Sequence, residues 1–155
     1  MAKVDFHSQV KDKVHYACRL IRKIISLSKE EDPFQTIVVL GSQEVLTELN
    51  EKLWTFSSDD FLPHCFIDED AFELCPILLV ELGNQHRLDA LSHQDVLIHL
   101  GQDALVNIEE LVQRYQRVVE VVSMESADLL AGRERYKKYR TLGLELQNFD
   151  QKGAS

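Results

Sequence analysis

Apolar residues follow two spacings that alternate along this chain. Short apolar segments are typical of strands, and uninterrupted ones such as residues 37–40 are typical of parallel strands covered on both sides by helices. Apolar residues three and four positions apart instead predict amphipathic helices. We expect strands at residues 3–7, 37–40, 76–80, 95–100 and 117–123, and helices at about 11–27, after Ser42 (buried face Val45, Leu46, Leu49 and Leu53), at 108–115 and at about 125–142. This order predicts an open, mainly parallel sheet with helices on both faces, a three-layer, Rossmann-like α/β domain.

Polar residues, glycines and serines mark the expected boundaries. Ser42 is placed to cap the second helix, Ser123 or Ser126 to cap the last one, and Gly143 to end it. The polar segment 81–94 predicts an exposed loop or an edge hairpin. The domain is therefore expected to cover residues 1–144, with a loose tail at 145–155.

Composition narrows the class of protein. The 155 residues are 45% hydrophobic and 28% charged, as in an ordinary soluble domain. No apolar run reaches the roughly 18 residues of a membrane span, and no signal-peptide order opens the chain, so we expect a cytoplasmic protein without a membrane partner.

Cysteine and histidine give no sign of a metal or cofactor. Cys18, Cys65 and Cys75 are odd in number and lack a Cys-x-x-Cys spacing, so reduced thiols are expected rather than a disulfide framework or a zinc site. His64 beside Cys65 is also a poor ligand pair, because neighbouring side chains of an extended segment point to opposite faces.

One stretch departs from the overall charge. The chain has a formal net charge of −9, which argues against a general duplex-DNA binder, but residues 133–140 carry five bases and one acid, or +4. On a helix, Arg133, Lys137 and Arg140 share one face, with Tyr136 at its edge. Cations beside a phenol ring suit a ligand that is both acidic and aromatic. The alternative interpretation is an ordinary solvated basic face near a helix C-terminus.

Two other functions stay open as alternatives. A nucleotide-using or hydrolytic α/β enzyme would need a phosphate loop or a Gly-x-Ser-x-Gly turn, and the turn at Gly41 has neither Gly-x-Gly-x-x-Gly nor a P-loop lysine. Direct binding of single-stranded nucleic acid would use Tyr136 and Tyr139 as stacking rings, against the negative charge of the rest of the chain.

Two separated strings resemble one known family. The string Arg-Glu-Arg-Tyr-Lys-Lys-Tyr-Arg at 133–140, with Gly143 three residues on, is similar to the C-terminal signature of the chi subunit of bacterial DNA polymerase III. Leu53-Trp54, followed by Phe-Leu-Pro-His at 61–64, resembles the family's Leu-Trp and Phe-Val-Pro-His. The order of the other elements agrees, so the resemblance spans nearly the whole chain.

The resemblance implies a non-catalytic accessory subunit of the clamp-loader assembly. Family members of this type bind the acidic C-terminal tail of single-stranded DNA-binding protein, which ends in an apolar segment. By position, Arg133 matches the residue that pairs with the terminal carboxylates, Tyr136 and Lys137 match its neighbours, and Val122 matches the lining of the apolar pocket, with Arg140 on the same helix face. Leu129 stands at a position that is basic in the family.

The resemblance also implies a second surface. Trp54 and Phe61 match aromatic residues at the contact with the psi subunit or with a competing helicase partner. A protein of this kind would contact DNA only indirectly, and would join the nucleoid through the replisome.

Overall fold

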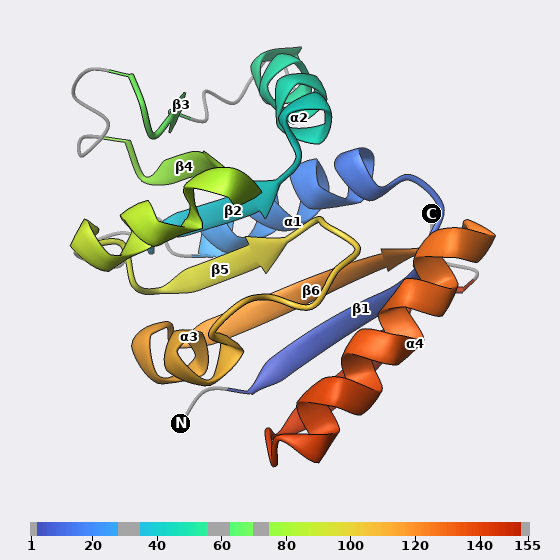
Figure 1. The fold of residues 1–155 in the computed structure, drawn as a ribbon. Coiled ribbons are helices and arrows are strands. Elements are labelled where there is room, and N and C mark those ends of the chain that lie inside the picture. The colour runs from blue at the N-terminus through green and yellow to red at the C-terminus, as the bar shows by residue number, and fades with distance from the viewer. Residues whose placement is uncertain (1–2, 28–34, 56–62, 70–74, 153–155) are drawn as a thin grey trace.

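The sheet has seven strands, all of them parallel (Figure 1). The computed structural model describes residues 3–27, 35–55, 63–69 and 75–152. The strands are β1 (Val4–Val10), β2 (Ile37–Gly41), β3 (His64–Phe66), β4 (Ile77–Glu81), β5 (Val96–His99), β6 (Arg117–Ser123) and β7 (Leu146–Asp150). Their order in the sheet is β3-β4-β2-β5-β6-β1-β7, so β3 and β7 form the two edges.

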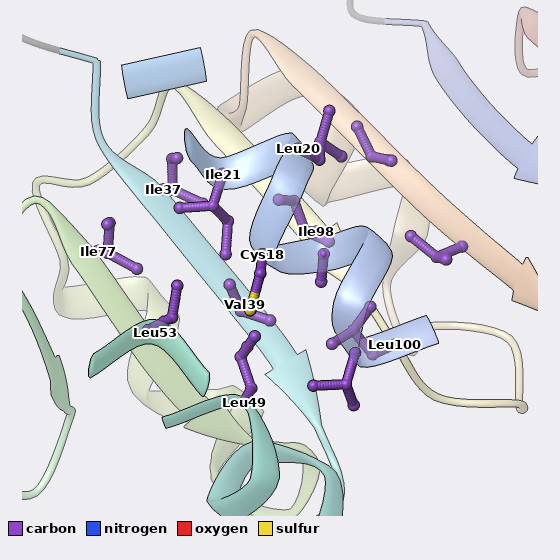
Figure 2. Packing of buried hydrophobic residues seen from close by; sticks show 14 of the residues in the cluster. Cys18, Leu20, Ile21, Ile37, Val39, Leu49, Leu53, Ile77, Ile98 and Leu100 are labelled. Carbon is purple, nitrogen blue, oxygen red and sulfur yellow. The ribbon is translucent and has the colours of Figure 1, made fainter. Parts of the chain in front are cut away.

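Helices cover both faces of this sheet. They are α1 (Lys13–Leu27), α2 (Gln43–Thr55), the 3-10 helix η2 (Leu82–Ala90), α3 (Ile108–Arg114) and α4 (Ser126–Thr141). Helices α1 and α2 pack on one face, where Cys18, Ile21, Leu49 and Leu53 meet Val39 (Figure 2). Residues of η2, α3 and α4 join the core on the other face. The predicted three-layer α/β fold is confirmed.

The segment after β4 differs from the prediction of an exposed loop or hairpin. Residues 82–90 form η2, in which Leu88 is only 1% exposed and packs into the core on the sheet face that α3 and α4 also cover. Polar residues separate its few leucines, so the sequence has no apolar periodicity that would predict this burial.

The prediction of a loose tail after residue 144 is wrong for residues 146–150. They form β7, which pairs with β1 from Val4↔Leu146 to Ser8↔Asp150. Gly143, with φ of +83°, takes the chain from α4 back toward the sheet, a backbone conformation that glycine adopts without a steric penalty. Strand β7 satisfies backbone groups along β1, and the domain therefore extends to at least Asp150.

The two predicted caps have different outcomes. The Val45 backbone N–H donates to Ser42 Oγ at 3.3 Å, which confirms the cap of α2. The N-cap residue of α4 is instead Glu125, without a side-chain cap bond, and Ser126 is the first helical residue. Ser123 Oγ accepts from the Glu125 N–H, before the helix begins.

The expectation of three reduced thiols is also wrong. Cys65 and Cys75 form a disulfide, with Cα atoms 6.3 Å apart, between β3 and the residues that precede β4. The two strands are neighbours in the sheet, and their pairing brings together cysteines that are ten positions apart in the sequence. Cys18 is free and buried, and burial raises its pKa to about 11.

The described ranges hold neither a metal cluster nor a membrane-spanning helix. They contain no cluster of three or more His, Cys, Asp or Glu side chains that could hold a metal ion. None of their helices combines the length and the apolar character that crossing a membrane requires.

Candidate functional site

Helix α4 is fixed to the sheet by side chains on its inner face. Asp128, Gly132, Arg135 and Tyr139 are all buried, at three- and four-residue steps. Figure 1 shows this helix running beside β1, close to one edge of the sheet. The basic stretch 133–140 therefore has a buried side as well as a solvent-facing side.

A carboxylate in the middle of β6 receives the buried side of α4. Glu120 is fully buried, and its Oε1 accepts from Arg135 Nε at 3.0 Å and from His99 Nδ1 at 2.7 Å. Its Oε2 accepts from the Tyr139 hydroxyl at 2.7 Å, and that hydroxyl accepts from the Leu105 N–H at 3.0 Å. These four side chains form a buried polar network inside an apolar layer, and Arg135 also donates from Nη1 to the Gln102 carbonyl.

Electrostatics within the network keep Glu120 ionised. Burial alone raises the pKa of its carboxyl, but His99, Arg135 and Tyr139 together outweigh burial and lower that pKa. Burial, and then the Glu120 charge, raise the pKa of Tyr139, so its hydroxyl stays a donor. The Arg135 charge is therefore compensated and is not available to a ligand.

A second polar contact fixes the first turn of α4. Asp128 accepts from the Ser123 N–H at 2.7 Å and from Lys13 Nζ at 3.0 Å. Burial opposes ionisation of Asp128, but the Ser123 and Lys13 contacts outweigh it and lower the pKa of the carboxyl. This carboxylate ties the end of β6 to both α4 and α1.

Gly132 lets the middle of α4 approach β6 closely. A Cβ atom at this position would lie 2.6 Å from Val122 Cγ1, well inside van der Waals contact. Glycine inside a helix costs about 1 kcal/mol relative to alanine, so its presence here points to a packing requirement. Val122 thereby becomes the floor of the space beside the helix.

That space is a pocket of about 450 Å³ between α4 and the strands β6, β1 and β7. It is lined by residues of β1, β6, α4 and β7: Phe6, Ser8, Gln9, Val122, Leu129, Gly132, Arg133, Tyr136, Lys137, Arg140, Asn148 and Asp150. Its volume lies within the roughly 300–1,000 Å³ of ordinary ligand pockets. The apolar part is formed by Val122, by Phe6 and by Tyr136, whose ring lies edge-on to Phe6 at 5.1 Å between centroids.

All five residues assigned from the sequence to this site line the same pocket. Val122 is buried at its floor, Tyr136 is half-buried, and Arg133, Lys137 and Arg140 are exposed at its rim. Leu129 also lines it. The predicted common face of Arg133, Lys137 and Arg140 is confirmed.

The rim cations are largely free to receive a ligand. Lys137 lies 3.9 Å from Glu134, and both side chains are well exposed, so this pair is weak. In the part of the chain that the structure describes, no carboxylate lies within ion-pair distance of Arg133 or Arg140.

Sequence reasoning missed one wall of the pocket. Asn148 and Asp150 come from β7, which was expected to be a loose tail, and Ser8 and Gln9 come from the end of β1. Gln9 has φ of +61°, beside a register shift in β1. Among the pocket residues that the sequence did not assign, Gly132 is the one whose residue type indicates close packing, because glycine is unfavourable inside a helix.

The alternative in which Tyr136 and Tyr139 stack on nucleic-acid bases is wrong in that form. Tyr139 is 0% exposed and its hydroxyl is bound to Glu120. A base cannot reach its ring.

The second assigned surface is described only in part. Trp54, near the end of α2, is 52% exposed, and its ring lies 4.4 Å from that of His64 on β3. Phe61 lies outside the described residues. Because β3 and β7 are opposite edges of the sheet, Trp54 lies at the far edge from the pocket.

The fold and the pocket together define a small α/β domain with a cationic, partly apolar pocket. The family model described as "DNA polymerase III chi subunit, HolC" matches residues 1–147, and the chain belongs to this family. Two relatives carry the name DNA polymerase III subunit chi. The protein from Pseudomonas aeruginosa is 29% identical over 152 residues, which are 96% of each chain. The protein from Haemophilus influenzae is 27% identical over 130 residues, covering 84% of this chain and 81% of the relative.

Membership of this family gives the protein its general role. The resemblance seen in the two sequence strings is confirmed, and the chain is an accessory subunit of DNA polymerase III in DNA replication. Its partners are therefore expected within the polymerase complex.

Proposed function

We propose that this protein is a non-catalytic subunit that links the clamp loader, through the psi subunit, to the acidic C-terminal tail of single-stranded DNA-binding protein. The observation that carries the proposal is the pocket beside α4, which combines a buried apolar floor with three rim cations. The role suits a protein that works in the cytoplasm, on the nucleoid, and contacts DNA through its partner.

The pocket has the chemistry that such a tail requires. The apolar end of the peptide would pack against Val122 and the paired rings of Phe6 and Tyr136. Carboxylates would bind Arg133, whose planar guanidinium can donate to two carboxylate oxygens at once, and Lys137.

The expected affinity is modest. A charge-assisted contact contributes about 1.5–3 kcal/mol, and ordering a flexible tail offsets part of it, so one tail should bind in the micromolar range. Several tails on one partner would raise the effective concentration and compensate for weak single contacts.

Trp54 supports the second half of the proposal. A large exposed aromatic side chain at the opposite edge of the sheet is typical of a protein contact, and it would allow psi and the tail to bind together. Trp54→Ala should weaken binding of purified psi and leave the peptide affinity unchanged.

The pocket is tested by calorimetric titration with a short acidic peptide that ends in Phe. Arg133→Ala should raise the dissociation constant about ten-fold or more, the equivalent of one charge-assisted contact. Lys138→Ala is the matched control, because Lys138 is exposed on the same helix and does not line the pocket. A peptide without the final Phe should also bind more weakly. Equal affinity for wild type and Arg133→Ala would show that the tail binds elsewhere.

A further inference from the structure

The opposite face of the same sheet edge carries a second cationic surface. Side chains along β1 and β7 alternate between faces, so Phe6 and Asn148 point toward α4 whereas His7 and Phe149 point toward α1. Helix α1 packs over β6, and the outer part of this face stays open, with Phe149 39% exposed. We name this surface the edge shelf: Tyr16, Arg19, Lys23, Arg117, Gln147 and Phe149.

Three rings hold the shelf together. The His7 ring lies 5.3 Å from that of Phe149 and 5.6 Å from that of Tyr16, and His7 Nδ1 is hydrogen-bonded to the Tyr16 hydroxyl. His7 is buried and Tyr16 is half-buried. Phe149 is thus a supported ring with an accessible surface, as in a stacking platform.

Three cations act electrostatically on two of these rings. Arg117 and Lys23 act on His7, whose pKa falls to about 4, chiefly because of burial and then because of these two charges, while Asp5 opposes them. Burial raises the pKa of Tyr16, and Arg117 and Arg19 oppose that shift. Positive charges from α1 and from β6 therefore converge on one patch.

Few acids neutralise this patch. Helix α1 contains no Asp or Glu, although the whole chain has a net charge of −9. Arg19 and Lys23 are exposed, and no carboxylate of the described ranges lies within ion-pair distance of either. Arg117 pairs with Asp5 at 3.1 Å and still keeps 38% of its side chain exposed.

We propose that the edge shelf binds single-stranded nucleic acid, with a base stacked on Phe149 and phosphates beside Arg19 and Lys23. An exposed ring within a group of cations is the arrangement that single strands use, because every base has a stacking face and every nucleotide a negative charge. An acidic peptide with an apolar end fits the pocket on the other face better, since the shelf offers a surface ring rather than a cavity. The contact would be weak and direct, in addition to the contact through the tail of single-stranded DNA-binding protein.

The experiment is fluorescence anisotropy of a labelled oligothymidylate of about 15 nucleotides with the full chain at low salt. Phe149→Ala should weaken binding about five-fold or more, through loss of stacking. Phe149→Leu, which keeps the packing on His7, should weaken it similarly, and Phe149→Trp should preserve or strengthen it. With about three phosphates bound, the logarithm of affinity should fall with the logarithm of salt at a slope near −2.

Charge variants separate the shelf from the pocket. Lys23→Glu and Lys138→Glu both change the net charge from −9 to −11. Only Lys23→Glu should sharply weaken binding of the oligonucleotide. Arg133→Ala should leave binding of the oligonucleotide unchanged. Binding to the edge shelf can therefore be demonstrated even if the pocket does not bind the tail. The proposal is overturned by an absence of binding at low salt, by equal effects of both charge variants, or by a Phe149→Leu variant that binds like wild type. It is equally overturned if Lys23→Glu weakens binding of the acidic peptide and leaves binding of the oligonucleotide unchanged.

Discussion

The two sides of helix α4 present the same kinds of residue in opposite environments. Arg135 and Tyr139 are buried and meet Glu120, whereas Arg133 and Tyr136, two and three residues away, line the pocket. The helix period alone separates the pairs, since residues 133 and 137 lie on one side and 135 and 139 on another.

This contrast lowers the number of positive charges that the basic stretch 133–140 offers to a ligand. Its formal charge is +4, but the Arg135 charge is compensated by Glu120 inside the protein. Three cations, Arg133, Lys137 and Arg140, remain at the pocket. The buried pair positions the helix, and the pocket-facing pair is available to a ligand.

The largest effect is expected when the buried arginine is removed. Arg135→Ala leaves the Glu120 carboxylate buried without its guanidinium partner and should lower the free energy of unfolding by about 3 kcal/mol or more. Arg133→Ala should leave it within about 0.5 kcal/mol of wild type. Urea unfolding measures both. The double variant Glu120→Gln/Arg135→Met, which removes both charges, should recover part of the loss, and an equal loss for the two arginine variants would contradict the contrast.

Acid should weaken the same buried contact. The pKa of Glu120 is lower in the folded protein than in the unfolded chain, so its contribution is complete above the ordinary carboxyl pKa of about 4.3 and is lost as the pH falls through the lower folded value. Asp128 acts in the same direction. Unfolding as a function of pH should therefore show a steeper acid loss for wild type than for Glu120→Gln, and parallel curves would show that Glu120 does not contribute.

Gly132 tests the distance between α4 and the pocket floor. Alanine inside a helix is usually about 1 kcal/mol more favourable than glycine, but here its Cβ would meet Val122. We expect Gly132→Ala to destabilise the protein by about 1–3 kcal/mol through overpacking and to weaken the acidic peptide. Gly132→Ala/Val122→Ala should relieve the clash. A simple gain in stability for the single variant would show that the close approach is unimportant.

Tyr139 and Tyr136 allow the buried and the pocket-facing side of α4 to be compared by removing one hydroxyl oxygen from each. Tyr139→Phe leaves the Leu105 N–H unpaired and takes a donor from Glu120, which should cost about 1–3 kcal/mol. Tyr136→Phe should change the free energy of unfolding by no more than about 0.5 kcal/mol. Equal losses would mean that the hydroxyl of Tyr139 has no special structural role.

Much of the fold was readable from the sequence because its strands are buried on both faces. Uninterrupted apolar runs such as residues 37–40 can only be covered from both sides, and this requires helices in two layers. Strand β7 gave no such signal, because four of its five residues are exposed. Strand β7 forms because it pairs with the backbone of β1, and the apolar pattern of one segment does not show which other segment will pair with it.

The pocket was only partly readable for a related reason. Helix spacing placed Arg133, Lys137 and Arg140 together, because those residues are neighbours in the sequence. The walls from β1 and β7 come from the two ends of the chain and meet only after the sheet has formed. Glu120 did leave a trace, since a single acid inside a valine-rich strand needs a buried partner.

The smallest expected effect concerns Leu129, which lines the pocket at a position that the sequence resemblance implies to be basic in the family. Leu129→Lys would add a fourth cation on the ligand-facing side of α4 without touching the Glu120 network. A charge pair of this kind contributes about 0.2–1 kcal/mol, so affinity for the acidic peptide should rise about two- to five-fold at low salt. The gain should disappear at high salt, because added ions screen exposed charges. Leu129→Met is the neutral control, and a gain that it shares with Leu129→Lys would point to packing rather than to charge.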